Sequence, residues 1–237
     1  MKAEKQLFCF PFAGGSASFF DVLRPNLPEA EIISQDYPGH GSRRSEKLCT
    51  EISQVADDAF SFLRSRLSGE DYALLGYSMG TIIAVEVLRR ICADNDIKPP
   101  VCVFLAAHKP VTDYGISMAE QSDDYVIERT VGFGAISQEI ASGNVFRRLY
   151  LPLYRADYSM IGRYRFEDLD ARFSLPLTVF YSSTDTPLEE VRGWTEFFTE
   201  GCGFYQFSGD HLFLREHHEE IAGIIRSKLF LEDLNDF

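Results

Sequence analysis

The stretch LLGYSMGTIIAVEVL, residues 74–88, places one hydroxyl, that of Ser78, inside an otherwise apolar run. Gly76 and Gly80 flank this serine in the pattern G-x-S-x-G. The residues before it suit a buried strand, and those after it suit a buried helix. Between a strand and a helix, this pattern is typical of a tight turn that presents the serine oxygen above the end of a sheet. We therefore predict that Ser78 is a nucleophile, next to a helix start whose free N–H groups suit an oxyanion.

Length and composition indicate one globular domain over residues 1–237, with 45% apolar and 25% charged residues. No apolar run approaches the roughly 20 residues that cross a membrane. Pro11 interrupts the N-terminal apolar run, which also lacks a cleavage pattern, so we expect a cytoplasmic protein. The five cysteines show no CxxC pair and no metal-like spacing with histidine, which predicts reduced thiols and no metal site.

The formal charge is −13, from 23 basic and 36 acidic residues spread along the chain. Such a surface repels phosphate backbones, so nucleic-acid binding is not expected. We expect a monomer.

Short β-rich runs alternate with longer helical patterns, which predicts the α/β class, with a mostly parallel central sheet flanked by helices. Residues 51–67, for example, carry apolar side chains at helical spacing on one face. The predicted strands are 6–10, 31–35, 72–75, 101–106, 177–181 and 203–207. The other predicted helices are 79–93, 188–198 and a last one from about residue 216.

Residues 111–174 interrupt this alternation, because they contain no good strand. A segment of about sixty residues is longer than a crossover or an ordinary loop requires. We predict that it is a helical lid inserted within the single domain. It is rich in aromatic residues, most of which we expect to pack the insertion onto the body, and some to line an apolar pocket.

A serine hydroxyl becomes a good nucleophile only with a base and a carboxylate that orients the base. Among the five histidines, His211 is the best candidate, because it follows the last predicted strand, where ligand-facing loops emerge. Asp185 follows the strand 177–181 and completes the chain order Ser, Asp, His that α/β-hydrolases use. Asp210 is the rival acid. Since sequence neighbours rarely point at each other's rings, we expect Asp210 to serve the turn instead.

The loop after the first strand, residues 11–16, reads PFAGGS. Its glycines allow the backbone to approach a ligand closely, so one N–H of this loop is expected to join that of Met79 in an oxyanion hole. A phosphate-binding loop is not indicated, because no G-K-[ST] follows.

Five segments together resemble the type II thioesterases of polyketide and nonribosomal peptide synthesis. They are FPFAGGSAS (10–18), YPGHGSR (37–43), GYSMG (76–80), LPLYRADY (151–158) and GDHLFL (209–214). The resemblance covers nearly the whole chain, and PFAGGSAS and LPLYRADY are its most specific parts. It implies an α/β-hydrolase with a helical lid that removes acyl groups from the phosphopantetheine arm of acyl or peptidyl carrier proteins. Such an enzyme clears aberrant or stalled units through an acyl-serine intermediate and needs no metal or cofactor of its own.

The resemblance also implies roles for individual residues: Ser78 as nucleophile, Asp185 as orienting acid, His211 as base, and the backbone N–H groups of Met79 and of Ala13 or Phe12 as oxyanion donors. Two positions depart from the family pattern. Relatives usually have histidine where this chain has Tyr77, and a glycine before the loop of the acid where this chain has Tyr181, Ser182 and Ser183.

Carrier proteins are typically acidic, as this chain is, so long-range attraction does not explain how they would meet. Arg43 and Arg44, or Arg147 and Arg148 in the lid, are candidates for a local basic rim that binds the phosphate of the arm. Two functions other than the hydrolysis of carrier-bound thioesters remain open at this point. One is a hydrolase of free small esters or acyl-CoA, which would use the same three residues. The other is a non-catalytic binding module on a hydrolase fold.

Overall fold

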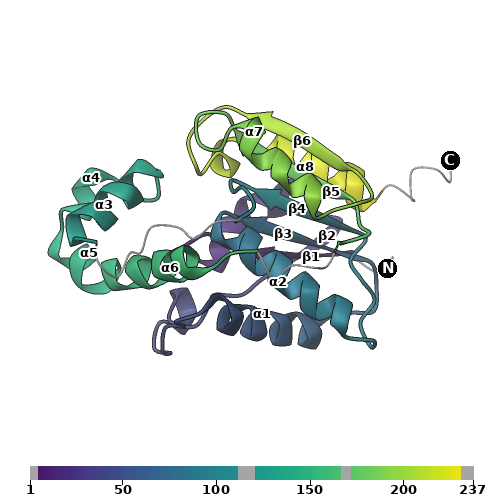
Figure 1. Ribbon diagram of the computed structural model, residues 1–237, viewed down its shortest axis with the longest axis horizontal. Coiled ribbons are helices and arrows are strands. Elements are labelled where there is room, and N and C mark those ends of the chain that lie inside the picture. The colour runs from purple at the N-terminus through teal and green to yellow at the C-terminus, as the bar shows by residue number, and fades with distance from the viewer. Residues whose placement is uncertain (1–4, 112–120, 167–171, 231–237) are drawn as a thin grey trace.

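The computed structural model describes residues 5–111, 121–166 and 172–230, and its centre is a six-stranded sheet (Figure 1). Every pair of neighbouring strands is parallel, in the order β2-β1-β3-β4-β5-β6. The predicted α/β class is confirmed, with each strand close to its predicted place. The strands are β1 (Lys5–Phe10), β2 (Ala30–Ser34), β3 (Tyr72–Tyr77), β4 (Cys102–Ala106), β5 (Leu177–Ser182) and β6 (Cys202–Phe207).

Helices cover both faces of the sheet (Figure 1). Successive side chains of a strand point to opposite faces, and here they enter two separate cores. Leu74 packs with α1 (Ile52–Arg66) and α2 (Met79–Ala93), whereas Ala73 and Leu75 belong to the core under α8 (Leu214–Leu229). This burial on both sides explains why β3 reads as a continuous apolar run. Two short 3-10 segments, η1 (Ala17–Asn26) and η2 (Gly41–Arg43), complete the first third of the chain.

The helix predicted over residues 188–198 is shorter than expected. It consists of α7 (Leu188–Val191) and a 3-10 segment, η3 (Arg192–Glu196). Glycine is a poor helix former, and Gly193 lies so close to Pro110 that a Cβ there would come within 3.0 Å of the proline ring. The tighter turn buries Trp194, whose indole N–H donates to the carbonyl oxygen of His108 at 2.9 Å.

Residues 121–166 form four helices within the segment predicted to be a lid; residues 112–120 and 167–171 of that segment lie outside the described residues. The side-chain oxygen of Ser122 accepts the N–H of Tyr125 and so caps the first helix, which starts with two aspartates, as helix N-termini favour. In Figure 1 the helices stand beyond one end of the sheet. They are α3 (Asp123–Gly132), α4 (Gln138–Ala141), α5 (Asn144–Leu149) and α6 (Leu151–Arg163).

The strand order reverses at β1, since the chain first adds β2 on one side of it and then β3 on the other. Ligands of open α/β sheets bind outside the carboxyl ends of the strands at such a point. The end of β1 lies beside the end of β3, with Phe10 opposite Gly76. The glycine-rich loop and the serine turn therefore start from adjacent strand ends.

None of the helices in the described residues has both the length and the apolar character that crossing a membrane requires.

Candidate active site

Ser78 occupies a strained turn between β3 and α2, with φ 53° and ψ −119°. Positive φ is uncommon outside glycine and concentrates at functional sites. The flanking glycines make this turn possible. A Cβ at Gly76 would collide with the carbonyl oxygen of Gly80, and one at Gly80 would collide with that of Phe10. The close approach of Gly80 to Phe10 also brings the loop after β1 against the start of α2. An oxyanion hole requires the loop at this place.

Ser78, His211 and Asp185 form one hydrogen-bonded chain. His211 Nε2 lies 2.8 Å from Ser78 Oγ, and His211 Nδ1 lies 2.8 Å from Asp185 Oδ2. Thr186 Oγ1 also donates to this carboxylate oxygen, at 3.0 Å. With Nδ1–H donating to Asp185, Nε2 is left free to accept the serine proton. The structure thus brings together the three residues that the sequence singled out.

The rival acid, Asp210, lies in the turn before the base. Its Oδ1 accepts the backbone N–H of Leu212 at 2.8 Å. An aspartate that accepts a backbone N–H two residues further along stabilises a local turn. Asp210 therefore holds the loop of His211 and not its ring.

The residues at the two departures from the family pattern both stabilise the loop that carries His211. The Tyr77 hydroxyl donates to the backbone oxygen of His211 at 2.8 Å. Ser182 Oγ and Thr184 Oγ1 donate to the carbonyl oxygen of Gly209 at 2.6 and 2.7 Å. Side chains from the ends of β3 and β5 thus fix the backbone that carries the base.

The loop after β1 makes a tight turn beside Ser78. Gly15 N–H donates to Phe12 O at 2.9 Å, and Gly14 has φ 72°, the features of a type II turn with glycine at its third position. Among the described residues, no hydrogen bond is donated by the N–H of Phe12, Ala13 or Met79. These are the groups proposed for the oxyanion hole, and Gly14 is not one of them, because its N–H donates to Asp157 at 2.7 Å.

A second histidine–aspartate pair, His40 and Asp157, joins α6 to this loop. Nothing in the sequence pattern paired these residues. His40 Nε2 lies 2.8 Å from Asp157 Oδ2, and its Nδ1 lies 3.1 Å from the carbonyl oxygen of Pro38. Burial alone would lower the pKa of His40, but the hydrogen bond and charge of Asp157 outweigh burial, so that its pKa is raised. Since both ring nitrogens face acceptors, we assign the charged imidazolium form.

This pair predicts a pH-dependent part of the stability. A group whose pKa is raised by folding stabilises the protein fully below its unfolded pKa, about 6.5 for histidine, and loses that effect as the pH rises through the folded pKa. We expect the difference in free energy of unfolding between the wild type and His40→Gln to be largest near pH 6 and to shrink toward pH 9. Urea titrations at several pH values measure it. Among the described residues, the other ionisable groups near the pair include Asp36, Tyr37, Cys49, Tyr154 and Tyr158. A difference that grows with pH would contradict the assignment.

The serine and its base line a cavity of about 380 Å³. Residues of the helical segment 121–166 form one wall, with the ring of Phe133 only 4.5 Å from that of His211. Arg129 also lines the cavity and lies over the rings of Phe133 and Tyr158, at 5.1 and 5.8 Å. The helical segment 121–166 therefore contributes directly to this cavity.

His108, at the end of β4, also faces this cavity. Burial lowers its pKa to about 4, so the ring is neutral near pH 7. Its neighbour Lys109 pairs with Glu190 at 2.7 Å. The sequence alone indicated no role for His108, because its pattern shows only that this residue follows a predicted strand.

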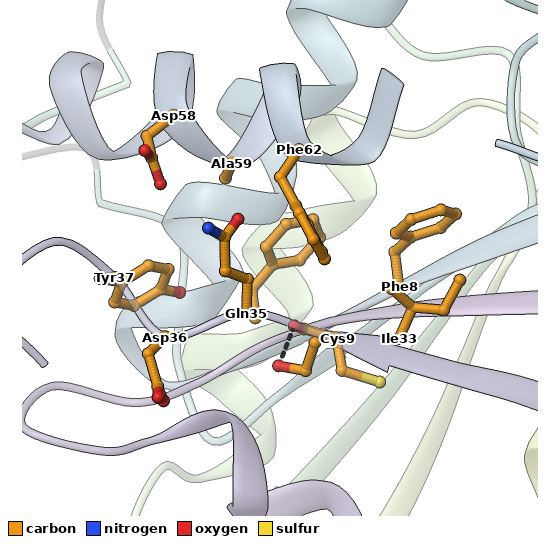
Figure 2. A pocket seen from close by; sticks show the side chains of 11 residues that line it. Phe8, Cys9, Ile33, Gln35, Asp36, Tyr37, Asp58, Ala59 and Phe62 are labelled. Atoms are coloured by element: carbon orange, nitrogen blue, oxygen red, sulfur yellow. Dashed lines mark hydrogen bonds between the residues drawn. The ribbon is translucent and has the colours of Figure 1, made fainter. Parts of the chain in front are cut away.

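A smaller pocket under α1 is shown in Figure 2, lined mainly by apolar side chains such as Phe8, Ala59 and Phe62. Its volume of about 10 Å³ is room for one water molecule. Burial raises the pKa of the Cys9 thiol, which also lines it, and keeps that thiol protonated. An acyl chain does not fit there, so the cavity at Ser78 is the better substrate site.

In the described part of the chain, no group of three or more His, Cys, Asp or Glu residues is placed to hold a metal ion.

The phosphate-binding role of Arg43 stays a prediction, and the structure pairs this side chain with two carboxylates. Its guanidinium donates to Asp58 at 2.6 and 2.8 Å and to Glu46 at 2.8 and 2.7 Å. Carboxylates of the same chain therefore already use its donors. Arg147 of the lid pairs with Asp124 at 2.9 Å. Arg44 is exposed, and its role stays a prediction.

A parallel sheet, a strained serine between strand and helix, and a histidine hydrogen-bonded to both the serine and an aspartate define a serine hydrolase of the α/β-hydrolase class. The model of the thioesterase domain family matches residues 5–229. The chain thus belongs to the thioesterase family, as its sequence motifs indicated, and is a hydrolase that acts on thioesters.

Relatives match over almost the full length. The chain is 27% identical to the gramicidin S biosynthesis protein GrsT of Aneurinibacillus migulanus, over 97% of this chain and 90% of that protein. It is 26% identical to the medium-chain S-acyl fatty acid synthase thioesterase of Homo sapiens, over 92% and 84% of the two chains. Among solved structures, it is similar to the type II thioesterase BorB from the borrelidin biosynthetic cluster, with a TM-score of 0.85 and 27% identity over 97% and 94%.

Proposed function

We propose that the protein removes acyl groups from the phosphopantetheine arm of acyl or peptidyl carrier proteins, and so clears aberrant or stalled units from a synthase. One observation carries the chemistry, namely the hydrogen-bonded chain Ser78–His211–Asp185 on the wall of a 380 Å³ cavity. The choice of substrate is supported by similarity to proteins of gramicidin S and borrelidin biosynthesis.

In this mechanism Ser78 Oγ attacks the thioester carbonyl while His211 Nε2 takes its proton. Asp185 holds the histidine tautomer and stabilises the imidazolium. The oxyanion accepts the N–H of Met79 and that of Ala13 or Phe12, and each such donor is worth about 3 to 4 kcal/mol.

Collapse of the tetrahedral intermediate releases the thiol of the arm, protonated by His211, and leaves an acyl group on Ser78. The same histidine then activates water, which attacks the acyl-serine and regenerates the enzyme. Because a thiolate leaves readily, these steps require only the nucleophile, the base and the oxyanion hole. We further expect the enzyme to work as a monomer beside its synthase in the cytoplasm, without a metal or cofactor of its own.

Comparison of two substrates with the same acyl group and the same pantetheine segment tests the carrier assignment. We expect kcat/KM for the acyl-carrier protein to exceed that for the matching acyl-CoA by at least about tenfold, or ~1.4 kcal/mol. The reason is that both substrates present the same thioester to Ser78, whereas only the carrier adds protein contacts. Steady-state hydrolysis with either substrate measures the ratio.

The Ser78→Ala variant gives the background rate for both substrates. Equal or better use of acyl-CoA would contradict the editing role and favour the alternative, a hydrolase of free small thioesters.

A further inference from the structure

The two most specific sequence segments, 11–18 and 151–158, meet in the fold where Gly14 donates to Asp157, and His40 from the segment 37–43 pairs with the same aspartate. The chemistry at Ser78 does not use this His40–Asp157 pair. Asp157 lies on α6 and is 0% exposed. Its Oδ2 is the acceptor both for His40 Nε2 at 2.8 Å and for Gly14 N–H at 2.7 Å. A single carboxylate oxygen thus connects the lid to the loop that is expected to form the oxyanion hole.

The bond to Gly14 selects one of two backbone conformations. Type I and type II turns differ mainly by a flip of the central peptide, which here joins Ala13 to Gly14. In the observed turn, the N–H of this peptide points at Asp157. The flipped peptide would direct a carbonyl oxygen at the carboxylate, where two acceptors repel each other.

A second contact from the same helix acts on the same glycine. The ring of Tyr154, three residues before Asp157, lies against Gly14 so closely that a Cβ there would collide with it. Helix α6 therefore fixes Gly14 both by a hydrogen bond and by packing.

The burial of the Asp157 carboxylate is energetically unfavourable, which indicates that packing alone does not explain its place in the fold. The other carboxylate oxygen, Asp157 Oδ1, is buried and accepts no hydrogen bond from the described residues. Burying a carboxylate whose bonding is incomplete is unfavourable. The charge of His40 offsets part of this cost, and its ring is held in place by the Pro38 carbonyl oxygen.

We propose that Asp157 and His40 are positioning residues for hydrolysis: Asp157, on lid helix α6 and paired with His40, holds the loop 11–16 in the observed turn, which places the N–H groups of Phe12 and Ala13 beside the thioester. Docking of α6 and formation of the oxyanion hole are then one event. This proposal rests on the proposed function only in requiring that Ser78 and this loop act on thioesters; it does not depend on the carrier protein.

The test compares Asp157→Ala and Asp157→Asn with Glu86→Gln. Glu86 provides a matched control, because it is a buried carboxylate on α2 that accepts the hydroxyl of Tyr164 at 2.6 Å, just after the far end of α6. The substrate is a short-chain acyl thioester of N-acetylcysteamine, so carrier recognition plays no part. Measurements are kcat, KM and the thermal midpoint.

We expect Asp157→Ala to lower kcat by about 10²- to 10³-fold, the loss typical for one oxyanion donor, with KM within about threefold of wild type. Asp157→Asn keeps an acceptor for Gly14 N–H and should lose less. Glu86→Gln removes the charge that pairs with Arg89 and Arg90 and should therefore also lower the thermal midpoint, but it should leave kcat within about threefold, because the oxyanion loop is intact.

If Asp157→Ala keeps wild-type kcat, or if its loss of kcat is matched by Glu86→Gln at equal destabilisation, the positioning role is wrong. If Asp157→Ala does not fold, His40→Gln and Asp157→Asn decide instead. A lowered kcat with unchanged KM in both supports the proposal, and wild-type kcat in both overturns it. Failure of the proposed function is distinguishable, since it would appear as equal or better use of acyl-CoA than of acyl-carrier protein by the wild type, whatever the variants do with the N-acetylcysteamine thioester.

Discussion

Replacing Ser78 by alanine is expected to lower kcat for thioester hydrolysis by at least about 10³-fold, the scale on which serine hydrolases lose activity without their nucleophile. The reason is geometric. Among the described residues, Ser78 is the one whose hydroxyl lies within hydrogen-bond distance of His211 Nε2, at 2.8 Å, and it directly precedes the start of α2. The substrate cavity is otherwise unchanged, so KM should stay within about threefold. Steady-state kinetics with an acyl thioester measure both quantities.

Ser183→Ala is the matched control, because it removes an exposed hydroxyl in the loop after β5. It should retain wild-type kcat. Substantial turnover by Ser78→Ala, with the background of contaminating hydrolases excluded, would show that another group attacks the thioester.

Asp185→Asn is expected to lower kcat by about 10³- to 10⁴-fold, because an asparagine amide can donate to His211 Nδ1 and so favour the wrong tautomer. The observed 2.8 Å contact between Asp185 Oδ2 and His211 Nδ1 requires a pure acceptor for the correct tautomer. The serine and the cavity remain, so the loss should appear in kcat. A pH–rate profile and the steady-state constants measure it.

Asp210→Asn separates this role from that of the neighbouring acid. Its side-chain oxygen accepts Leu212 N–H, and an asparagine oxygen accepts the same bond. This variant should keep kcat within about threefold. A large loss in Asp210→Asn together with a small one in Asp185→Asn would reverse the assignment of the acid.

The sequence predicted the sheet well because parallel strands are buried on both faces. Runs such as residues 72–75 are therefore continuously apolar, and polar residues appear in the turns that follow them. The serine turn was predictable for the same reason, since Gly76 and Gly80 are required where backbones approach too closely for a Cβ. The order of Ser78, Asp185 and His211 followed from their places after strands.

Contacts between distant segments could not be predicted from local patterns. His40 and Asp157 are 117 residues apart, and only the docking of α6 brings them together. Their presence in two of the five segments that resemble the thioesterase family was the available signal. The ion pairs of Arg43 could not be predicted for a related reason. One partner, Glu46, lies three residues further along, but the other, Asp58, reaches it from the next helix.

Tyr77 shows that a departure from a family pattern can have a structural role. Its side chain is fully buried, and its hydroxyl reaches the backbone oxygen of His211. The sequence could identify the substitution, but not the contact, because the loop of the base comes from the other end of the chain.

A fluorophosphonate probe, followed by peptide mapping, measures whether Ser78 is an activated nucleophile. The probe reacts covalently with a serine whose proton a base removes. We expect one labelled peptide in the wild type, the one that contains Ser78, and no labelling in Ser78→Ala. No labelling of the folded wild type, or undiminished labelling of Ser78→Ala, would contradict the acyl-serine mechanism.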